Sequence, residues 1–376
     1  MNITTEPHQE VWHDMREPGA YEWWYFDAED KESGVSVVLI WFSGFPFSPY
    51  YMQRYDDWKH KSGSALPLPA DHTGFSFQLY EQGSETLNFI REGGNGLFES
   101  SREGIGLRFE KNRFFYDAHK DEYRLLVDFD FPARNRQVQA ELLFQVSRRA
   151  HYSKNDANNA ETGSQHQWLL SVPKALVGGF IEITGENGGG VRRIELRAQG
   201  YHDHNLGTMP MQEYIARWYW GRAFSERYDV IYYVIFFKNS DFQPLSFLML
   251  HDNRDEQVSV MDSLQCRESE FSSGLFSPLH GRTLELSHER ASLTVSQKNV
   301  LDAGPFYLRF ASNISLQVDG QHLNGISGIS EFLNPVRLQS RFMRFFTRSR
   351  IWRDKEPSFM YDYYNFFKSC TDWFKR

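Results

Sequence analysis

The sequence predicts an all-β protein whose strands are mainly antiparallel. Apolar and polar residues alternate in many short segments, such as residues 123–131 and 138–146, which is typical of strands with one face in water. Denser apolar runs at residues 35–42 and 230–237 are rich in β-branched and aromatic residues, which indicates strands covered on both faces. A helical amphipathic pattern is convincing only at residues 336–352.

The strands divide into two sheet-based units that meet near residue 207. Turn signals rich in Gly and Asn separate successive strands and predict hairpins. The polar stretch 153–165 has almost nothing to bury, so we expect a mobile loop within a domain. The expected domains are residues 1–206, residues 207–335 and a C-terminal helical tail, residues 336–376.

Composition excludes several classes of protein. The 376 residues carry a net charge of −8 and no basic stripe with stacking aromatics, so a nucleic-acid partner is not expected. Cys266 and Cys370 have no metal-binding spacing and predict no disulfide framework. The chain begins without an apolar signal segment and has no apolar run of roughly 20 residues, so we expect a soluble, cytoplasmic product.

Arginines interleave with aromatic residues in the tail at residues 336–352. Such a segment can be a capping helix docked on a β-barrel, because docking alone explains an amphipathic face. Docking is the favoured interpretation. The alternative is that the segment lies in a membrane interface, and the aromatic residues of 359–374 extend the same pattern. Both interpretations remain open, and a lipid-soluble substrate would favour the membrane.

Aromatic residues make up 16% of the chain, which predicts large cores or a large apolar cavity. In a strand over residues 200–205, Tyr201, Asp203 and Asn205 share one face, while His202 and His204 share the other. The pleat therefore separates the carboxylate of Asp203 from both imidazoles, and no metal site is expected.

Aromatic residues around a buried acid favour proton-transfer chemistry. Burial holds the proton on a carboxylic acid to higher pH, and the faces of aromatic rings stabilise a nearby cation. By the same strand parity His166 pairs with Trp168, and Trp218 with Trp220. Either these aromatic faces fill the interior of a barrel, or they line a substrate cavity. The residues expected to bind substrate are Trp23, Trp24, Tyr25, Trp218, Trp220 and Asn205.

Other catalytic templates are missing from the sequence. It contains no G-x-S-x-G elbow, no phosphate-binding Walker loop and no H-E-x-x-H motif. Hydrolase and nucleotide-dependent functions are therefore not expected.

Five motifs occur along nearly the whole chain: Tyr21-Glu-Trp-Trp-Tyr-Phe-Asp27, His166-x-Trp168, Gly200-Tyr-His-Asp-His-Asn205, Trp218-Tyr-Trp-Gly-Arg222 and Gly325-x-x-Gly328-x-x-Glu331. Together they resemble those of the carotenoid 1,2-hydratase family, also called hydroxyneurosporene synthases. That family is similar to a wider group of paired lipocalin-like proteins that includes fungal Diels-Alderases. The resemblance implies two lipocalin-like antiparallel β-barrel or sandwich domains, followed here by the C-terminal helix.

The resemblance also implies an activity: cofactor-free addition of water to the terminal C1,2 double bond of an acyclic carotenoid or related isoprenoid. The family's proposed catalytic residues correspond to His166, Trp168, Tyr201 and Asp203. Asp203 would protonate the alkene, and Tyr201 would orient the Asp203 side chain. Trp168, with Trp23 or Trp218, would stabilise the tertiary cation. The proton of water would pass to His166 or back to Asp203.

Two other functions fit the same features. A cyclase or pericyclase would fold a polyene without adding water, and a binding protein would carry a polyene or lipid without changing it. A shared fold does not decide between them. All three share a hydrophobic polyene as partner.

Overall fold

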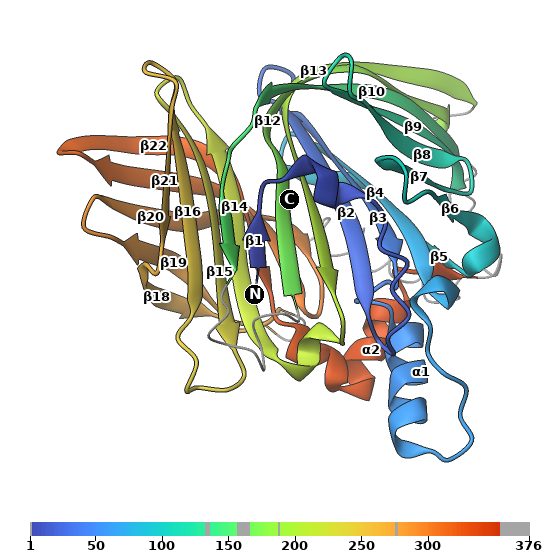
Figure 1. Ribbon diagram of the computed structural model, residues 1–376. Coiled ribbons are helices and arrows are strands. Elements are labelled where there is room, and N and C mark those ends of the chain that lie inside the picture. Colours follow the sequence, from blue (N-terminus) through green and yellow to red (C-terminus); the bar gives the residue numbers. More distant parts are fainter. Residues whose placement is uncertain (1, 132–135, 156–165, 187–188, 275–276, 354–376) are drawn as a thin grey trace. The chain divides into compact units, whose positions relative to one another are not determined.

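The computed structural model describes residues 2–131, 136–155, 166–186, 189–274 and 277–353. These residues form two compact units. The first contains the chain up to Pro210 together with Phe345 onward, and the second contains Met211–Arg344. The predicted all-β class is confirmed, because both units are built on curled, mainly antiparallel sheets (Figure 1).

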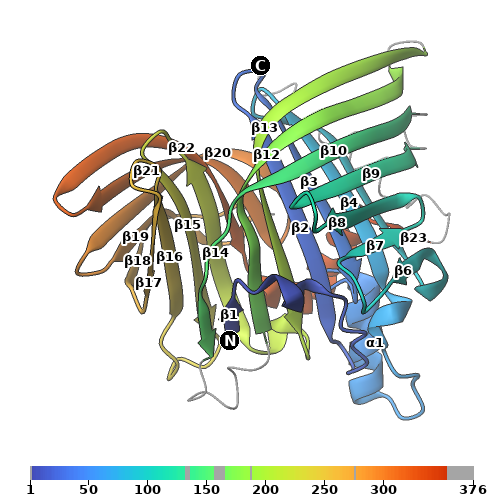
Figure 2. The ribbon, with the colours of Figure 1, turned by 45° about the horizontal axis from the view of Figure 1, so that its top comes forward.

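The first unit carries a 14-stranded sheet. Twelve strands follow the order β23-β5-β4-β3-β2-β13-β12-β10-β9-β8-β7-β6, while β1 pairs with β11 and β12. Figure 2 shows the blue and green strands of this sheet curving along its length. Its strands are β1 (Asn2–Thr4), β2 (Tyr21–Asp30), β3 (Val35–Ser43), β4 (Thr73–Glu81), β5 (Ser84–Gly93), β6 (Phe98–Ser100), β7 (Gly106–Phe109), β8 (Asn112–Asp117), β9 (Glu122–Phe131), β10 (Arg136–Arg148), β11 (Ser153–Asn155), β12 (His166–Glu186), β13 (Gly190–Gly207) and β23 (Trp352–Arg353).

One face of this sheet holds the core of the first unit. Trp24 and Phe26 of β2 project into it, with Trp41 of β3 and Phe144 of β10 among their buried neighbours. Successive residues of a strand point to opposite faces, so Tyr21, Trp23, Tyr25 and Asp27 of β2 must occupy the other face. The candidate site lies on that other face.

Gly200 lets β13 pass close to β2 directly before the site. A Cβ atom at Gly200 would lie 2.5 Å from Val177, 2.7 Å from Phe144 and 2.9 Å from the carbonyl oxygen of Asp27. Any side chain here would therefore push apart the strands that carry Asp27 and Tyr201.

The second unit carries a nine-stranded antiparallel sheet in the order β17-β16-β15-β14-β22-β21-β20-β19-β18. Its core includes Tyr219, Tyr232, Leu248, Leu293 and Phe332. The strands are β14 (Ile215–Phe224), β15 (Tyr228–Phe237), β16 (Leu245–Asp252), β17 (Gln257–Asp262), β18 (Gln265–Ser272), β19 (His280–Ser287), β20 (Ala291–Ala303), β21 (Tyr307–Val318) and β22 (Gln321–Leu333).

Two α-helices occur in the described ranges. The helix α1 (Pro49–His60) begins where Ser48 accepts hydrogen bonds from the backbone N–H groups of Tyr50 and Tyr51. Ser followed by Pro is a typical start of a helix, so Ser48-Pro49 is a local sequence signal for α1. Neither helix has the length and apolar content needed to cross a bilayer.

The C-terminal helix is shorter than predicted. α2 covers only Arg341–Arg348, after a 3-10 turn at Pro335–Gln339. After α2, Ile351 and Trp352 are buried, and residues 352–353 pair with β5 as strand β23. Of the predicted loop 153–165, Ser153–Asn155 forms strand β11 and residues 156–165 lie outside the described ranges.

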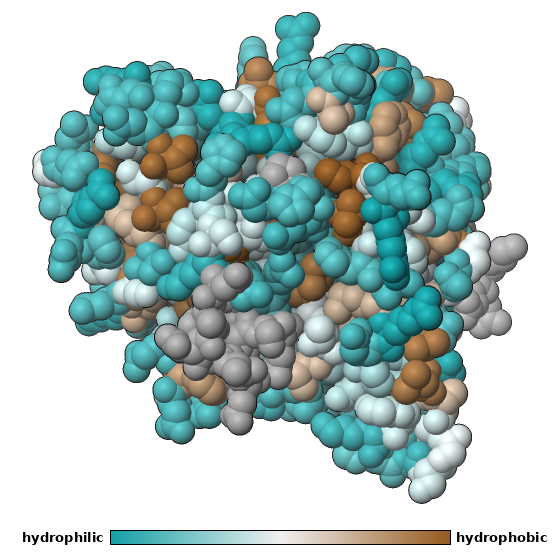
Figure 3. All heavy atoms as spheres, in the orientation of Figure 1, coloured by the Kyte–Doolittle hydropathy of each residue, from teal (hydrophilic) through white to brown (hydrophobic). Residues whose placement is uncertain are grey.

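Charged and polar side chains cover most of the face of the protein shown in Figure 3, with apolar side chains in small groups. Most large aromatic residues are correspondingly buried in the two units.

Candidate active site

Asp203 is a buried carboxylate, 5% exposed, held by three hydrogen-bond donors. The Tyr201 hydroxyl donates to Oδ2 at 2.7 Å, and the Trp168 indole Nε1 donates to the same oxygen at 2.9 Å. The Asn205 amide donates to Oδ1 at 2.9 Å. Burial favours the neutral form of a carboxyl group, whereas hydrogen-bond donors favour the carboxylate, and both effects act on Asp203.

The strand register brings these groups together. On β13, Tyr201, Asp203 and Asn205 share one face, as the alternation predicted. Trp168 of β12 lies opposite Asn205, which places its indole N–H beside Asp203. Sequence alternation grouped the residues within each strand, but it did not reveal that Trp168 would be a hydrogen-bond donor to the acid.

His166 forms a neighbouring cluster with Tyr21 and Trp23. The Tyr21 hydroxyl lies 2.8 Å from His166 Nδ1, and the Tyr21 and Trp23 rings stack with their centroids 5.4 Å apart. The Trp23 ring lies 6.0 Å from the imidazole. Burial lowers the pKa of His166 to about 3, so the imidazole is neutral at pH 7.

Tyr25 and Asp27 continue the same face of β2. The Tyr25 hydroxyl donates to Asp27 Oδ2 at 2.9 Å, and Asp27 is fully buried. The rings of Tyr25 and Tyr201 meet edge to face with centroids 6.2 Å apart. Asp27 was not among the predicted site residues.

Trp24 lies on the opposite face of the sheet from Asp203. It belongs to the core cluster, donates from Nε1 to the Glu10 carbonyl oxygen and stacks on His204. The structure therefore does not bring Trp24 together with Asp203, because neighbouring residues of a strand face opposite ways.

His202 also lies on that opposite face, within a buried polar network. Its Nε2 lies 2.6 Å from Glu10 Oε1, its Nδ1 lies 2.8 Å from the Tyr25 carbonyl oxygen, and the Tyr123 hydroxyl donates to Glu10 Oε2 at 2.6 Å. These contacts tie the N-terminal segment to β2 and β13 behind the site.

His204 is joined to Glu22 and His13. The Glu22 Oε1 atom lies 2.9 Å from His204 Nε2 and 2.7 Å from His13 Nδ1. These three residues are the one group in the described ranges with a metal-binding donor set, their ligand atoms within 4.8 Å of one another. Asp203 is indeed turned away from the histidines, but sequence reasoning did not find that Glu22 supplies a carboxylate on their face.

Trp218 and Trp220 lie in the second unit on β14. Both are buried, and both occupy the face of β14 opposite Tyr219, which points into the core of that unit. The Trp218 ring meets Tyr233 edge to face at 6.2 Å.

By its fold the protein is of the paired lipocalin-like class. Its first unit carries the buried Asp203 beside Trp, Tyr and Asn donors. The chain belongs to the carotenoid hydratase family, because the family model described as "Carotenoid hydratase CrtC" matches residues 39–360.

Relatives agree with this assignment. The chain is 52% identical over 368 residues to a protein named hydroxyneurosporene dehydrogenase from Chlorobaculum tepidum, covering 98% of this chain and 96% of that protein. It is 23% identical over 210 residues to an acyclic carotenoid 1,2-hydratase from Rubrivivax gelatinosus, covering 55% of this chain and 45% of the hydratase.

Solved structures share the fold. The structure of CghA with Sch210972 matches with a TM-score of 0.57 at 13% identity, covering 89% of this chain and 98% of CghA. Kievitone hydratase from Nectria haematococca matches with a TM-score of 0.50 at 11% identity, covering 89% of this chain and 96% of that chain.

Proposed function

We propose that this protein is a cofactor-independent hydratase that adds water to the terminal C1,2 double bond of an acyclic carotenoid or related isoprenoid. The observation that supports this most directly is Asp203, a buried carboxyl group among a phenol, an indole and an amide. Membership of the carotenoid hydratase family supplies the substrate class.

Hydration of an unactivated alkene begins with a proton. Asp203, as the neutral acid, transfers its proton to C2 and leaves a tertiary cation at C1. Its Oδ2 atom accepts hydrogen bonds from Tyr201 and Trp168, and its Oδ1 atom accepts one from Asn205. We assign the transferred proton to Oδ1, because Oδ2 is held by the Tyr201 and Trp168 donors. Water then adds to C1 and gives up a proton, so that one water molecule is added in total.

The neighbouring residues hold the acid and stabilise charge. Tyr201 and Trp168 fix Asp203 by hydrogen bonds and disperse the negative charge left after proton transfer. Indole faces contribute about 2 kcal/mol to a desolvated cation by cation–π attraction, which we assign to Trp168 and Trp23. His166 is the fourth residue of the proposed catalytic set, with Asp203, Tyr201 and Trp168.

Product mass tests the reaction. Lycopene or neurosporene is incubated with the protein in heavy-oxygen water, and hydration adds the mass of one labelled water molecule. Cyclisation would leave the mass unchanged, dehydrogenation would remove two hydrogens, and a binding protein would give no product. Any of these three outcomes would contradict hydration.

Asp203→Asn tests the acid. This substitution nearly preserves volume and hydrogen bonding but removes the transferable proton, so turnover should be abolished while the fold and polyene binding persist. Trp168→Phe should slow turnover less, because an aromatic face remains although the indole N–H donor is lost. Normal turnover by Asp203→Asn would rule out this mechanism.

We further propose that the C-terminal tail, residues 336–376, contacts a membrane surface, from which a polyene substrate is taken. Phe342 and Phe345 of α2 are 57% and 49% exposed, beside the exposed Arg341. Exposed aromatic residues next to a cation are typical of segments that lie in a membrane interface.

A further inference from the structure

Two Tyr-x-Asp pairs face each other on neighbouring strands. Tyr25-Phe-Asp27 lies on β2, and Tyr201-His-Asp203 lies on β13. In each pair the Tyr hydroxyl donates to Oδ2 of the Asp two residues later, at 2.9 Å and 2.7 Å respectively. In the antiparallel register, Tyr201 stands opposite Asp27, and Asp203 stands opposite Tyr25. The two pairs are therefore related by a local two-fold arrangement.

This register makes the two carboxyl groups diagonal neighbours on one face of the sheet. Diagonal residues of an antiparallel pair lie roughly 7–8 Å apart. Inverting glycosidases likewise use two carboxyl groups close together, one to protonate an atom and the other to activate a water molecule that attacks the resulting cation. Alkene hydration needs the same two operations.

The second operation needs a proton acceptor. The neutral His166 imidazole is a weak base, since burial lowers its pKa to about 3. Asp27 offers a carboxylate on the same face as Asp203, fully buried and already oriented by Tyr25.

We infer that Asp27 is a second acid–base group of this site, which accepts the proton of the attacking water after Asp203 has protonated the alkene. This inference rests on the proposed hydratase function. It gives Tyr25, predicted to bind substrate, the further role of positioning Asp27, as Tyr201 positions Asp203.

The proton balance closes over one cycle. Asp203 loses its proton to C2 and becomes a carboxylate. The water oxygen bonds to C1, and one water proton passes to Asp27. The proton then returns from Asp27 to Asp203, and the product contains one added water molecule with no change in oxidation state.

The experiment separates alkene protonation from water addition. In deuterium oxide the cation can return its original C2 hydrogen to Asp203, so recovered substrate gains deuterium even when water does not add. Asp27→Asn should lower hydration about 10²-fold, as expected for loss of a general base, while deuterium still enters recovered substrate at a rate within a few-fold of the unsubstituted protein. Asp203→Asn should abolish both.

Asp30→Asn is the matched control. Asp30 ends the same strand, is buried, and accepts backbone hydrogen bonds from Glu32 and Ser33, which an amide oxygen can also accept. This variant should hydrate normally. If Asp27→Asn does not fold, Tyr25→Phe replaces it, and hydration should fall several-fold while deuterium exchange persists.

Two results would overturn the role of Asp27. One is unchanged hydration by a folded Asp27→Asn variant, and the other is a parallel loss of hydration and exchange in that variant. Absence of hydration by the unsubstituted protein would instead overturn the proposed function, and with it the role of Asp27.

Discussion

Buried carboxylates of the first unit show at the scale of single residues how burial and hydrogen bonding oppose each other. Burial raises the pKa of Glu22 and is the largest single effect, yet hydrogen bonds from His13 and His204 together outweigh it and lower the pKa below the ordinary value of 4.5. Glu10 behaves in the same way, with His202 and Tyr123 as its partners. Glu22 and Glu10 are therefore ionised structural groups at neutral pH.

The lowered pKa of Glu22 predicts how stability depends on pH. A carboxyl group whose pKa is lower in the folded than in the unfolded protein stabilises the fold above its unfolded value, and that contribution is lost as pH falls through the folded value. Glu22→Gln should cost about 1.5–3 kcal/mol at pH 7, because hydrogen bonds to a charged group are lost. Below pH 4.5, where protonation of Glu22 begins to remove its contribution, the difference from the unsubstituted protein should shrink.

Urea unfolding at a series of pH values checks this dependence. Glu103→Gln is the control, because Glu103 is exposed, and its unfolding curve should match that of the unsubstituted protein throughout. A Glu22→Gln variant as stable as the unsubstituted protein at pH 7 would contradict the assignment.

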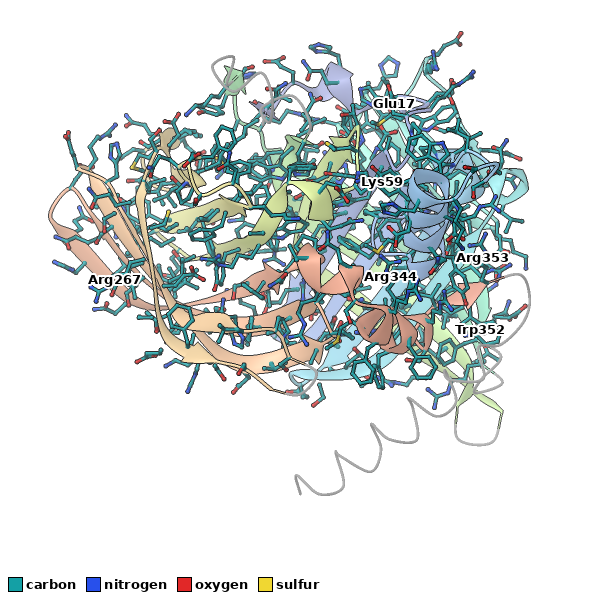
Figure 4. All side chains as sticks on the ribbon, turned by 90° about the horizontal axis from the view of Figure 1, so that it is seen from below. Glu17, Lys59, Arg267, Arg344, Trp352 and Arg353 are labelled. Carbon is teal, nitrogen blue, oxygen red and sulfur yellow. The ribbon has the colours of Figure 1, made fainter. Side chains whose placement is uncertain are left out.

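At the scale of elements, the two-residue strand β23 attaches the segment after α2 to the sheet of the first unit. It adds a parallel edge strand to β5, with Trp352 opposite Arg91 and Arg353 opposite Glu92. Trp352, labelled with Arg353 in Figure 4, is buried in the core cluster. Arg353 Nη1 donates to the fully buried Glu92 Oε1 at 2.9 Å. The segment after α2 is thus fastened to the first unit by packing and by charge.

Arg353→Ala should destabilise the first unit by about 2 kcal/mol, because removing one partner leaves the buried Glu92 charge less compensated. Thermal or urea unfolding measures this loss. Arg267→Ala is the control, since that side chain is 79% exposed and its ion pair with Glu285 spans 4.0 Å, so stability should not change. Equal stability of the two variants would show that the Arg353–Glu92 pair does not fasten β23.

At the scale of the whole molecule, the two units differ in the candidate site residues that they carry. The first carries the acid, both Tyr-x-Asp pairs and the imidazole network. The second carries the buried Trp218 and Trp220 on one face of β14. The exposed side of the helix α2 carries Phe342 and Phe345, the aromatic residues proposed to meet a membrane.

Vesicle binding tests the membrane proposal on the full chain. Phe342→Ser combined with Phe345→Ser should weaken co-sedimentation with anionic lipid vesicles about tenfold, since two aromatic side chains no longer enter the interface. Phe271→Ser is the matched control, because Phe271 is 59% exposed on β18, and vesicle binding should not change. Unchanged vesicle binding by the double variant would contradict the proposal that Phe342 and Phe345 enter the membrane interface.

The sequence alone was sufficient for the β class, the family and the sharing of faces within each strand. Alternation of side chains is a property of one strand, so the grouping of Tyr201, Asp203 and Asn205 did not depend on the rest of the chain. The short helix α1 escaped prediction because its pattern is weakly amphipathic, although Ser48 marks its start. The C-terminal helix was overestimated because residues 352–353 pair with β5 as a strand, which an amphipathic pattern does not reveal.

Only the tertiary structure decided which strands lie side by side, and therefore which residues meet. Trp168 donates to a carboxylate 35 residues away, and Glu10 reaches His202 across 192 residues. The opposed Tyr25-x-Asp27 and Tyr201-x-Asp203 pairs arise from the register between β2 and β13. Register depends on the packing of distant strands against a common core, so no local periodicity can supply it.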